Sequence, residues 1–275
     1  MARSLSRRAF LAGAGAIAVS GGALAAGCAE DAPAPAAAAA DVPLAFIPFH
    51  GPHQAGITSH PSPAIGLMAA FTVLARDRDE LRAMFRDLSD EIEGLMAGRP
   101  PVARDPAFPP TDSGILGPEP APDNLAIVVS VGASLFDERY GLADRRPREL
   151  VTMPFIANDR LDPERSHGDL LVTVQAEHID TVVFALRQLM RRTRSTLTLT
   201  WVIDGFNRRG AAGERPPGSP RNFLGSLDGP ANIATDTSML SRHVWTGAAD
   251  DEPDWTAGGS YHVARIIRML VEFWD

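Results

Sequence analysis

The sequence predicts an α+β protein made of two consecutive ferredoxin-like domains, the second of them incomplete. Segments with strand character alternate along the chain with amphipathic helical segments, in the order β-α-β, loop, β-α-β, loop, β. Two successive units of this kind are typical of ferredoxin-like folds, in which helices pack on one face of an antiparallel sheet. The 275 residues, of which 45% are hydrophobic and 22% charged, have an ordinary globular composition. We place the first domain at residues 44–160 and the second at residues 161–275.

The first β-α-β unit combines an apolar strand, a helix with one apolar face and a second apolar strand. These three elements are predicted at residues 67–75, 79–96 and 125–131. The helix has apolar residues three or four positions apart, Asp77 or Asp79 available as its N-cap, and Gly98 just after its end. The almost unbroken apolar run of the second strand indicates burial on both faces. Residues 99–123 contain many prolines and are predicted to form a loop.

The second unit repeats this order further along the chain. Its strand, helix and strand are predicted at residues 169–175, 179–191 and 197–203. A loop rich in glycine and proline follows, and then a last strand at residues 260–274. Arg265 and Arg268 are three positions apart in this last strand, so a period of two predicts that they point to opposite faces.

The first 28 residues have the pattern of an export signal. Residues 1–8 are basic, and residues 11–26 are apolar and uncharged, a run too short for a comfortable membrane span. The segment Ser6–Leu11 (Ser-Arg-Arg-Ala-Phe-Leu) resembles the twin-arginine signal, whose pathway exports proteins that are already folded. Because folded export suits a protein that takes up its cofactor in the cytoplasm, the signal indicates a cofactor protein with a periplasmic or other extracytoplasmic location.

Cys28 is the only cysteine, so neither an intrachain disulfide nor a multi-cysteine metal site can form. Two interpretations of its position remain open. The small residues Ala25, Ala26 and Gly27 before it resemble a lipoprotein cleavage site, which would place a lipid anchor on Cys28. Ordinary signal cleavage near Ala25 or Ala26 would instead leave a soluble exported protein. In both cases residues 29–43, rich in alanine and proline, form a linker.

The charge of the chain argues against a nucleic-acid partner or an anionic membrane surface. The formal net charge is −8, whereas either partner would require a clustered basic face. The densest basic run, Arg191, Arg192 and Arg194, lies at the end of a predicted helix, where positive charge interacts favourably with the helix dipole. We therefore interpret this run as a solvated helix end.

The segment from Asn222 to Asn232 (Asn-Phe-Leu-Gly-Ser-Leu-Asp-Gly-Pro-Ala-Asn) is the most informative functional signal. It places one carboxylate, Asp228, between Gly225 and Gly229. Glycine can adopt backbone angles closed to other residues, so the main chain can approach a flat cofactor while the carboxylate acts as an acid–base group. Asp-Gly is also a common turn dipeptide, and a plain turn is the alternative interpretation.

Four segments of the chain share a pattern with a known family, in order and at compatible spacing. They are Phe49–Ile57, His167–Leu171, Gly225-x-x-Asp228-Gly229-x-x-Asn232 and Gly259–Asp275. Together they resemble the DyP-type (dye-decolourising) haem peroxidases, especially the exported branch linked to deferrochelatase, and the resemblance runs from Leu44 to the last residue. It implies two ferredoxin-like domains with haem b bound in the second, in agreement with the predicted architecture.

The resemblance also implies roles for single residues. Asp228 matches the family's distal acid–base carboxylate, and Gly229, Pro230 and Ala231 match the loop whose backbone lies against the haem. A positioned acid–base group of this kind typically accelerates a proton transfer by about 10²–10⁴-fold. Two residues depart from the family pattern. Ser226 replaces a common aromatic residue, and Pro230 replaces the usual threonine and removes an amide donor.

The resemblance predicts that important groups are missing from these 275 residues. The chain ends at Asp275, within a family motif, whereas the family's proximal haem-ligating histidine and distal arginine come later. We therefore expect a fragment or a frame-interrupted product with an unpaired sheet edge and an exposed apolar face. We also expect the chain to be inactive as a peroxidase by itself.

The histidines are predicted to be exposed or hydrogen-bonded rather than metal ligands, because no pair has metal-ligand spacing on a helix. They are His50, His53, His60, His167, His178, His243 and His262. For Arg265 and Arg268 two interpretations remain open: contact with a haem propionate, or a buried structural ion pair.

Three functions are compatible with the sequence. The first is an exported haem peroxidase that uses hydrogen peroxide to oxidise bulky organic reductants. The second is a deferrochelatase that releases iron from haem together with components of an iron-uptake system. The third is a non-catalytic remnant with a ferredoxin-like fold, since a fold does not fix a function. The family resemblance further implies a homo-oligomer.

Overall fold

The computed structural model describes residues 43–58, 63–102, 105, 107–110, 112–154, 156–207, 221–229, 231–233, 238–247 and 250–273. The predicted export signal, Cys28 and the predicted linker up to residue 42 lie outside the described residues, as do His60 and Pro230.

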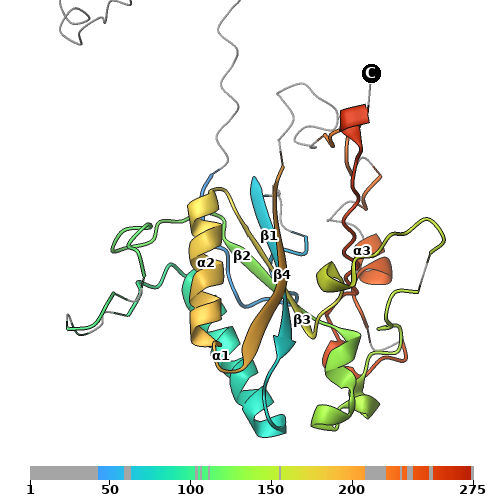
Figure 1. Cartoon of the computed structure of the whole chain (residues 1–275), viewed down its shortest axis with the longest axis horizontal. Helices are drawn as coiled ribbons and strands as arrows, with labels where there is room; N and C mark the ends of the chain where they lie inside the picture. The colour runs from blue at the N-terminus through green and yellow to red at the C-terminus, as the bar shows by residue number, and fades with distance from the viewer. Residues whose placement is uncertain are drawn as a thin grey trace, which may run out of the picture. The chain divides into compact units, whose positions relative to one another are not determined.

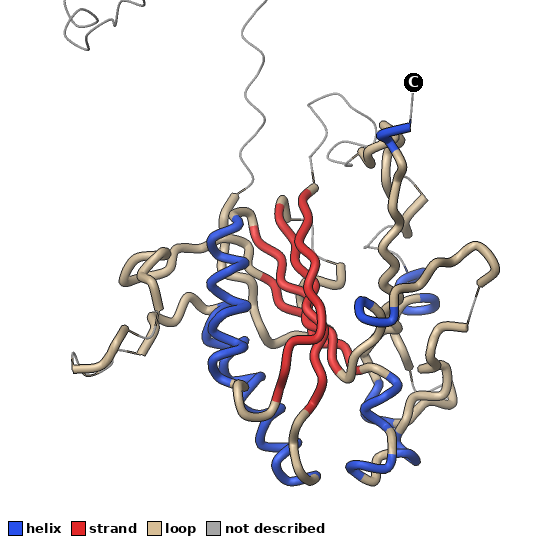
Figure 2. Tube along the Cα trace, in the orientation of Figure 1, coloured by secondary structure: helices blue, strands red, loops and turns tan. Residues whose placement is uncertain are grey.

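A four-stranded antiparallel sheet with two helices on one face forms the centre of the fold (Figures 1 and 2). The strands lie in the order β2-β3-β1-β4. Their bounds are β1 Ile65–Val73, β2 Ala126–Val131, β3 Leu170–Ala176 and β4 Leu197–Phe206, and those of the helices are α1 Arg78–Met96 and α2 Ile179–Arg192. The predicted α+β class is confirmed. None of the described helices is long and apolar enough to cross a membrane.

The core lies between the sheet and the two helices, because alternate residues of each strand point toward the helices. The register places Leu67 of β1 opposite Val174 of β3 and Phe71 opposite Leu170, so the inward side chains of the two strands form continuous rows. The buried residues that fill this space from the strands and from α1 include Ala69, Val73, Val172, Ala176, Leu81, Met84, Leu88, Ile92 and Met96. This burial provides the hydrophobic stabilisation of the fold.

The ends of α1 follow from local sequence signals. Asp77 is the N-cap, and its side chain accepts hydrogen bonds from the backbone N–H groups of Asp79 (3.0 Å) and Glu80 (2.8 Å). These bonds satisfy two of the amide donors that a helix start leaves unpaired. Gly98, two residues past the end, has a φ of +69°, a left-handed conformation that favours glycine. Of the two N-cap candidates in the sequence, Asp77 is the one used.

The domain boundary predicted between residues 160 and 161 is corrected by the sheet. β3 and β4 lie after residue 160, yet both pair with β1. Within each β-α-β unit the two strands are not neighbours, because β3 lies between β1 and β2, and β1 lies between β3 and β4. The two strands that each helix connects are therefore separated by one strand of the other unit. The two units together form a single ferredoxin-like sheet.

The last predicted strand, residues 260–274, is also corrected. The described residues 260–273 pair with no strand and end in a short 3₁₀ turn at Val271–Phe273. A strand needs a neighbour for its backbone hydrogen bonds, and no described segment supplies one here. Arg265 and Arg268 therefore do not lie on opposite faces of a strand. Each forms an ion pair instead, Arg265 with Asp159 and Arg268 with Glu272.

A buried carboxylate ties three segments of the fold together. Asp169, only 4% exposed, accepts hydrogen bonds from the Val73 N–H (2.9 Å), the Ser134 hydroxyl (2.6 Å) and the Arg139 guanidinium (2.9 and 3.1 Å). Burial acts to raise the pKa of Asp169, but the hydrogen bonds from Arg139, Ser134 and Val73 outweigh it and hold the pKa below its usual value. The ionised carboxylate is thus the form that the fold stabilises.

A second acidic side chain anchors the start of α2. Asp123 is 7% exposed and accepts hydrogen bonds from Nδ1 of His178 (2.6 Å) and from the His178 backbone N–H (3.2 Å). The hydrogen bond with Asp123, together with its negative charge, raises the pKa of His178. Asn124, the next residue, has a φ of +52° and binds the N-terminal segment, with its Oδ1 accepting from the Ala45 N–H (2.9 Å).

We expect Asp169→Asn to lower the free energy of unfolding by about 2–3 kcal/mol at neutral pH. The substitution removes the buried charge of an ion pair, so that the guanidinium of Arg139 keeps only its more exposed partner Asp137. Urea denaturation followed by circular dichroism measures this loss. Asp79→Asn is the matched control, because Asp79 pairs with Arg82 while 89% exposed, and should change stability by less than about 0.5 kcal/mol. Equal stability of Asp169→Asn and wild type would contradict a structural role for this network.

We expect the contribution of His178 to stability to depend on pH. A folded-state pKa above the unfolded value means that the contribution is fully present below about pH 6.5 and is lost as pH rises through the folded pKa. His178→Gln should therefore lower the free energy of unfolding more at pH 5.5 than at pH 8.5, as measured by urea denaturation at both values. In an Asp123→Asn background this pH-dependent difference should disappear. If it persists there, Asp123 is not the cause.

Candidate functional site

The predicted acid–base carboxylate follows a tight turn at residues 221–227. Arg221 and Leu227 face each other in an isolated antiparallel bridge, and the Asn222 N–H donates to the carbonyl of Ser226 (3.0 Å). Within the turn the Gly225 N–H donates to the Asn222 carbonyl (2.9 Å), and Nη1 of Arg221 donates to the Gly225 carbonyl (2.8 Å). The backbone that leads to the carboxylate is therefore held by its own hydrogen bonds.

The side chain of Asn222 organises the tip of this turn. Its Oδ1 accepts from the backbone N–H groups of Leu224 (3.0 Å) and Ser226 (3.1 Å). An asparagine side chain commonly replaces a backbone carbonyl in this way. Gly225 has a φ of +80°, so a side chain at this position would be strained. The sequence had singled out Gly225, whereas the role of Asn222 was not predicted.

Asp228 lies directly after the turn with an exposed side chain. Gly229 follows with a φ of +83°, and its carbonyl accepts from the Asn232 N–H (3.0 Å), which turns the chain again. A Cβ on Gly229 would lie 2.8 Å from Nδ2 of Asn232. The predicted glycine conformations on both sides of Asp228 are confirmed. Ala231 is exposed, and Pro230 lies outside the described residues.

The turn contributes one residue, Leu224, to the lining of an apolar groove of about 430 Å³, and Asp228 is not among the lining residues. The residues that line this apolar groove are Leu224 from the turn and Ile267, Arg268, Met269, Leu270, Val271 and Phe273 from the C-terminal segment. Several of the apolar side chains are largely solvent-exposed, among them Ile267 (70%) and Phe273 (77%). Arg268 is the one charged residue of the lining, and its Nη2 contacts Oε1 of Glu272 at 2.6 Å. An exposed apolar surface of this kind marks a binding surface.

Four of the histidines have a partner elsewhere in the fold. His50 contacts Glu93 (3.0 Å), His178 contacts Asp123, and His262 contacts the Ser130 hydroxyl (3.1 Å), while burial lowers the pKa of His262. His53 Nδ1 donates to the Gly258 carbonyl (2.7 Å), and its ring stacks on Trp245 at 3.6 Å. Among the residues that the structure describes, no histidine lines the apolar groove. In the part of the chain that the structure describes, no group of three or more His, Cys, Asp or Glu side chains is placed to hold a metal ion.

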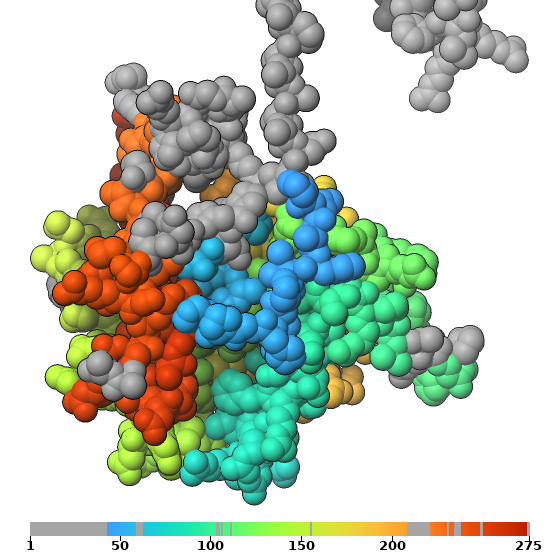
Figure 3. Space-filling model, turned by 180° about the vertical axis from the view of Figure 1, so that it is seen from behind, coloured from blue at the N-terminus to red at the C-terminus, as the bar shows by residue number. Residues whose placement is uncertain are grey.

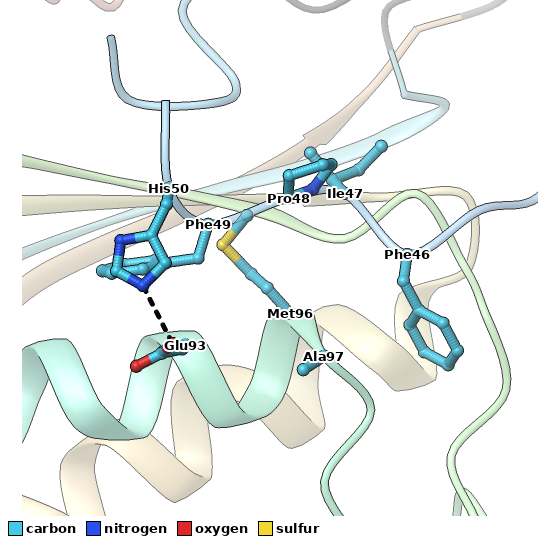
Figure 4. Close-up of a pocket in the computed structure, with 8 residues that line it drawn as sticks. All are labelled: Phe46, Ile47, Pro48, Phe49, His50, Glu93, Met96 and Ala97. Carbon is cyan, nitrogen blue, oxygen red and sulfur yellow. Dashed lines mark hydrogen bonds and ion pairs between the residues drawn. The ribbon is translucent and has the colours of Figure 1, made fainter. Parts of the chain in front are cut away.

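A second, smaller cavity of about 270 Å³ lies between residues 46–50 and the C-terminal end of α1 (Figure 4). Its lining is mainly apolar, and the hydrogen bond between His50 and Glu93 bridges its two sides. None of the predicted site residues that the structure describes contributes to it. The cavity is therefore separate from the Asp228 turn, and this hydrogen bond links two segments of the fold.

The N-terminal strap, residues 43–58, connects the sheet to the C-terminal part of the chain (Figure 3). Gln54 makes two hydrogen bonds with the backbone of Val129 in β2: its Nε2 donates to the carbonyl (3.0 Å), and its Oε1 accepts from the N–H (2.9 Å). One residue earlier, His53 contacts Gly258 and Trp245. A Cβ on Gly258 would lie 2.8 Å from the Pro52 carbonyl, so only glycine allows this close approach. Nothing in the sequence pattern predicted these contacts.

Two models of one protein family match the chain in succession. The description "Dyp-type peroxidase, N-terminal" matches residues 54–207, and "Dyp-type peroxidase, C-terminal" matches residues 219–275. The division between the two matches falls after β4, consistent with the correction of the predicted boundary at residue 160.

Several known proteins are similar to the chain. Deferrochelatase from Escherichia coli O6:K15:H31 (strain 536) is 42% identical over 272 residues, which cover 98% of this chain and 64% of the relative. The crystal structure of a DyP-type peroxidase from Streptomyces coelicolor has a TM-score of 0.65 at 32% identity, and the match covers 76% of this chain and 53% of that one. For a DyP-type peroxidase from Cellulomonas bogoriensis the TM-score is 0.63 at 32% identity, with 77% and 55% covered.

These matches span less than two thirds of the length of each relative. The predicted resemblance is nevertheless confirmed over most of this chain, because the two family models together begin at residue 54 and end at residue 275. The N-terminal model alone matches residues 54–207, which is more than half of the sequence. The chain therefore belongs to the Dyp-type peroxidase family.

Proposed function

We propose that the protein is a haem-dependent peroxidase that reduces hydrogen peroxide and oxidises organic reductants. One observation carries this proposal: Asp228 is an exposed carboxylate on a self-supported turn whose Leu224 lines an apolar groove. Such an arrangement suits an acid–base group beside a flat apolar cofactor. Membership of the Dyp-type peroxidase family supports it, as does the structure of ferric DtpA from Streptomyces lividans, similar at 32% identity with a TM-score of 0.65.

The apolar groove fits the chemistry of the porphyrin part of haem b. A porphyrin has two broad apolar faces and carries two carboxylates, and the groove offers six apolar residues and one arginine. Leu224, Ile267 and Phe273 would contact the ring, and Arg268 lies where a carboxylate could reach it. The described lining of the groove contains no histidine that could be an iron ligand. That the family's proximal histidine follows residue 275 stays a prediction.

The mechanism assigns proton transfer to Asp228. Bound haem supplies the two-electron redox chemistry. With haem bound, the carboxylate of Asp228 would accept a proton from one oxygen of hydrogen peroxide and donate it to the other, which could then leave as water. The cofactor would take up the remaining oxygen atom and supply the two electrons for cleavage of the O–O bond. The hydrogen bonds of the turn at residues 221–227 hold the backbone that leads to Asp228, and the exposure of its carboxylate allows exchange of protons with solvent.

In a haem-loaded version of the protein extended to the full length of its relatives, Asp228→Asn should lower the second-order rate constant for reaction with hydrogen peroxide by about 10²–10⁴-fold, because an amide cannot accept the proton. Stopped-flow absorption of the haem band measures this rate constant. The haem affinity of the variant should stay within about twofold of wild type, since Asn keeps the size of Asp. Asp204→Asn, at an exposed carboxylate of β4, serves as the matched control and should react at the wild-type rate. An undiminished rate for Asp228→Asn would show that Asp228 is not the acid–base group.

Release of iron from haem is a second candidate function. The relatives at 42% identity carry the name deferrochelatase, and this name is the observation that favours it. The two reactions have different products: iron release yields metal-free porphyrin, which fluoresces, and requires no peroxide. Fluorescent porphyrin formed under reducing conditions without peroxide would support iron release. If neither reaction occurs and haem does not bind stoichiometrically, the third interpretation, a non-catalytic remnant, is favoured.

We further propose that the protein is exported through the twin-arginine pathway and works outside the cytoplasm. The sequence Ser6–Leu11 and the following apolar run support this proposal. Lipid attachment at Cys28, iron-uptake partners and a homo-oligomeric state rest on the sequence resemblance alone. Export of a folded protein is consistent with a cofactor that is inserted before the protein leaves the cytoplasm.

A further inference from the structure

Two arginines of the C-terminal segment, three positions apart, are held in very different ways. Arg265 pairs with Asp159, whose side chain is 9% exposed. Arg268 pairs with Glu272, and both side chains are exposed, by 77% and 45% respectively. Separation of a buried carboxylate from its cation leaves an uncompensated buried charge, whereas an exposed ion pair contributes little to stability. Arg265 therefore forms a structural ion pair, whereas Arg268 can exchange its partner with little loss of stability.

Arg268 is also placed where an anionic ligand group would be recognised. It is the one charged residue in the lining of the apolar groove, and the other six lining residues are apolar. A ligand that is flat and apolar and carries a carboxylate at its edge would match both features. Burial of its apolar faces would favour binding, and its carboxylate would face the guanidinium, whose planar donors suit a carboxylate in a bidentate contact.

We propose that Arg268 binds a carboxylate of the porphyrin, and that Glu272 holds Arg268 until the porphyrin arrives. This inference rests on the proposed function, because it assigns a residue for one part of the same cofactor. Glu272 is four residues after Arg268, with its Oε1 at 2.6 Å from Nη2. The two carboxylates compete for one guanidinium. Glu272 therefore lowers the affinity of the groove for an anionic porphyrin and keeps an unpaired cation off the apolar surface.

Metal-free protoporphyrin IX and its dimethyl ester separate the carboxylate contact from the rest of the binding, because the two differ only in the charge of their side groups. Binding to the 275-residue chain is measured by porphyrin fluorescence. Arg268→Gln should weaken binding of the diacid by about 3- to 10-fold and change binding of the diester by less than about twofold. Glu272→Gln should strengthen binding of the diacid. Both effects should become smaller at high salt, since the contact is exposed.

The pair Arg76 and Glu80 supplies a matched control. These residues are also four apart, contact each other at 3.1 Å with Arg76 84% exposed, and lie at the start of α1 rather than at the groove. Arg76→Gln should therefore leave the affinity for both porphyrins unchanged. Circular dichroism verifies that each variant is folded.

The outcomes distinguish this inference from the proposed function. If both porphyrins bind to wild type and Arg268→Gln weakens both equally or neither, the carboxylate contact is wrong, while porphyrin binding by the protein stands. If Glu272→Gln weakens binding of the diacid, the competition is wrong, because removal of a competitor must strengthen binding. If neither porphyrin binds to wild type, this inference falls together with the proposed haem site.

Discussion

The buried carboxylate of Asp169 is the contact on which much of the fold depends. It lies at the start of β3 and binds the backbone at the end of β1 and two side chains from the turns that follow β2. The sheet alone aligns β1, β2 and β3 side by side, but it does not determine where the connecting turns lie. Because a buried charge is stable only when it is fully paired, Asp169 holds these turns in one arrangement. The requirement for a satisfied carboxylate thus sets the geometry of this end of the sheet.

The candidate site is built by a different principle. Its turn is stabilised by local contacts, in which Asn222 and Arg221 bind the backbone of the next few residues. The described residues around Asp228 are mostly exposed. A loop of this kind keeps its shape without a core beneath it, so its carboxylate can be presented at the surface to a cofactor or another part of the protein. The lining residues of the adjoining apolar groove are not part of the hydrophobic core either, and several of them are exposed.

Local signals allowed most of the helices and strands to be predicted. The spacing of apolar residues located α1 and α2, and Asp77 and Gly98 marked the limits of α1, because these signals act within a few residues. Pairing between distant segments was not predictable in this way. A β-α-β pattern does not indicate which strand lies between its own two strands. A single sheet built from both units was therefore interpreted as two domains. The apolar residues 260–273 were likewise interpreted as a strand, although apolar composition does not provide a pairing partner.

At the site, the sequence predicted the two glycine conformations around Asp228, because only glycine adopts them readily. The apolar groove and the different partners of Arg265 and Arg268 were not predicted, since they arise from contacts between residues far apart in the chain or on a segment without regular structure. The catalytic role of Asp228 is a matter of chemistry and not of conformation, so no backbone signal in the sequence could establish it.

The contact between Gln54 and β2 has a consequence for how the molecule avoids self-association. β2 is the last strand on its side of the sheet, and an edge strand offers unpaired backbone groups to any other extended chain. The side-chain amide of Gln54 forms hydrogen bonds with both the N–H and the carbonyl of Val129. At this position it satisfies the backbone groups that a neighbouring strand would otherwise pair. Detachment of the strap would uncover that edge and create a template for β-aggregation.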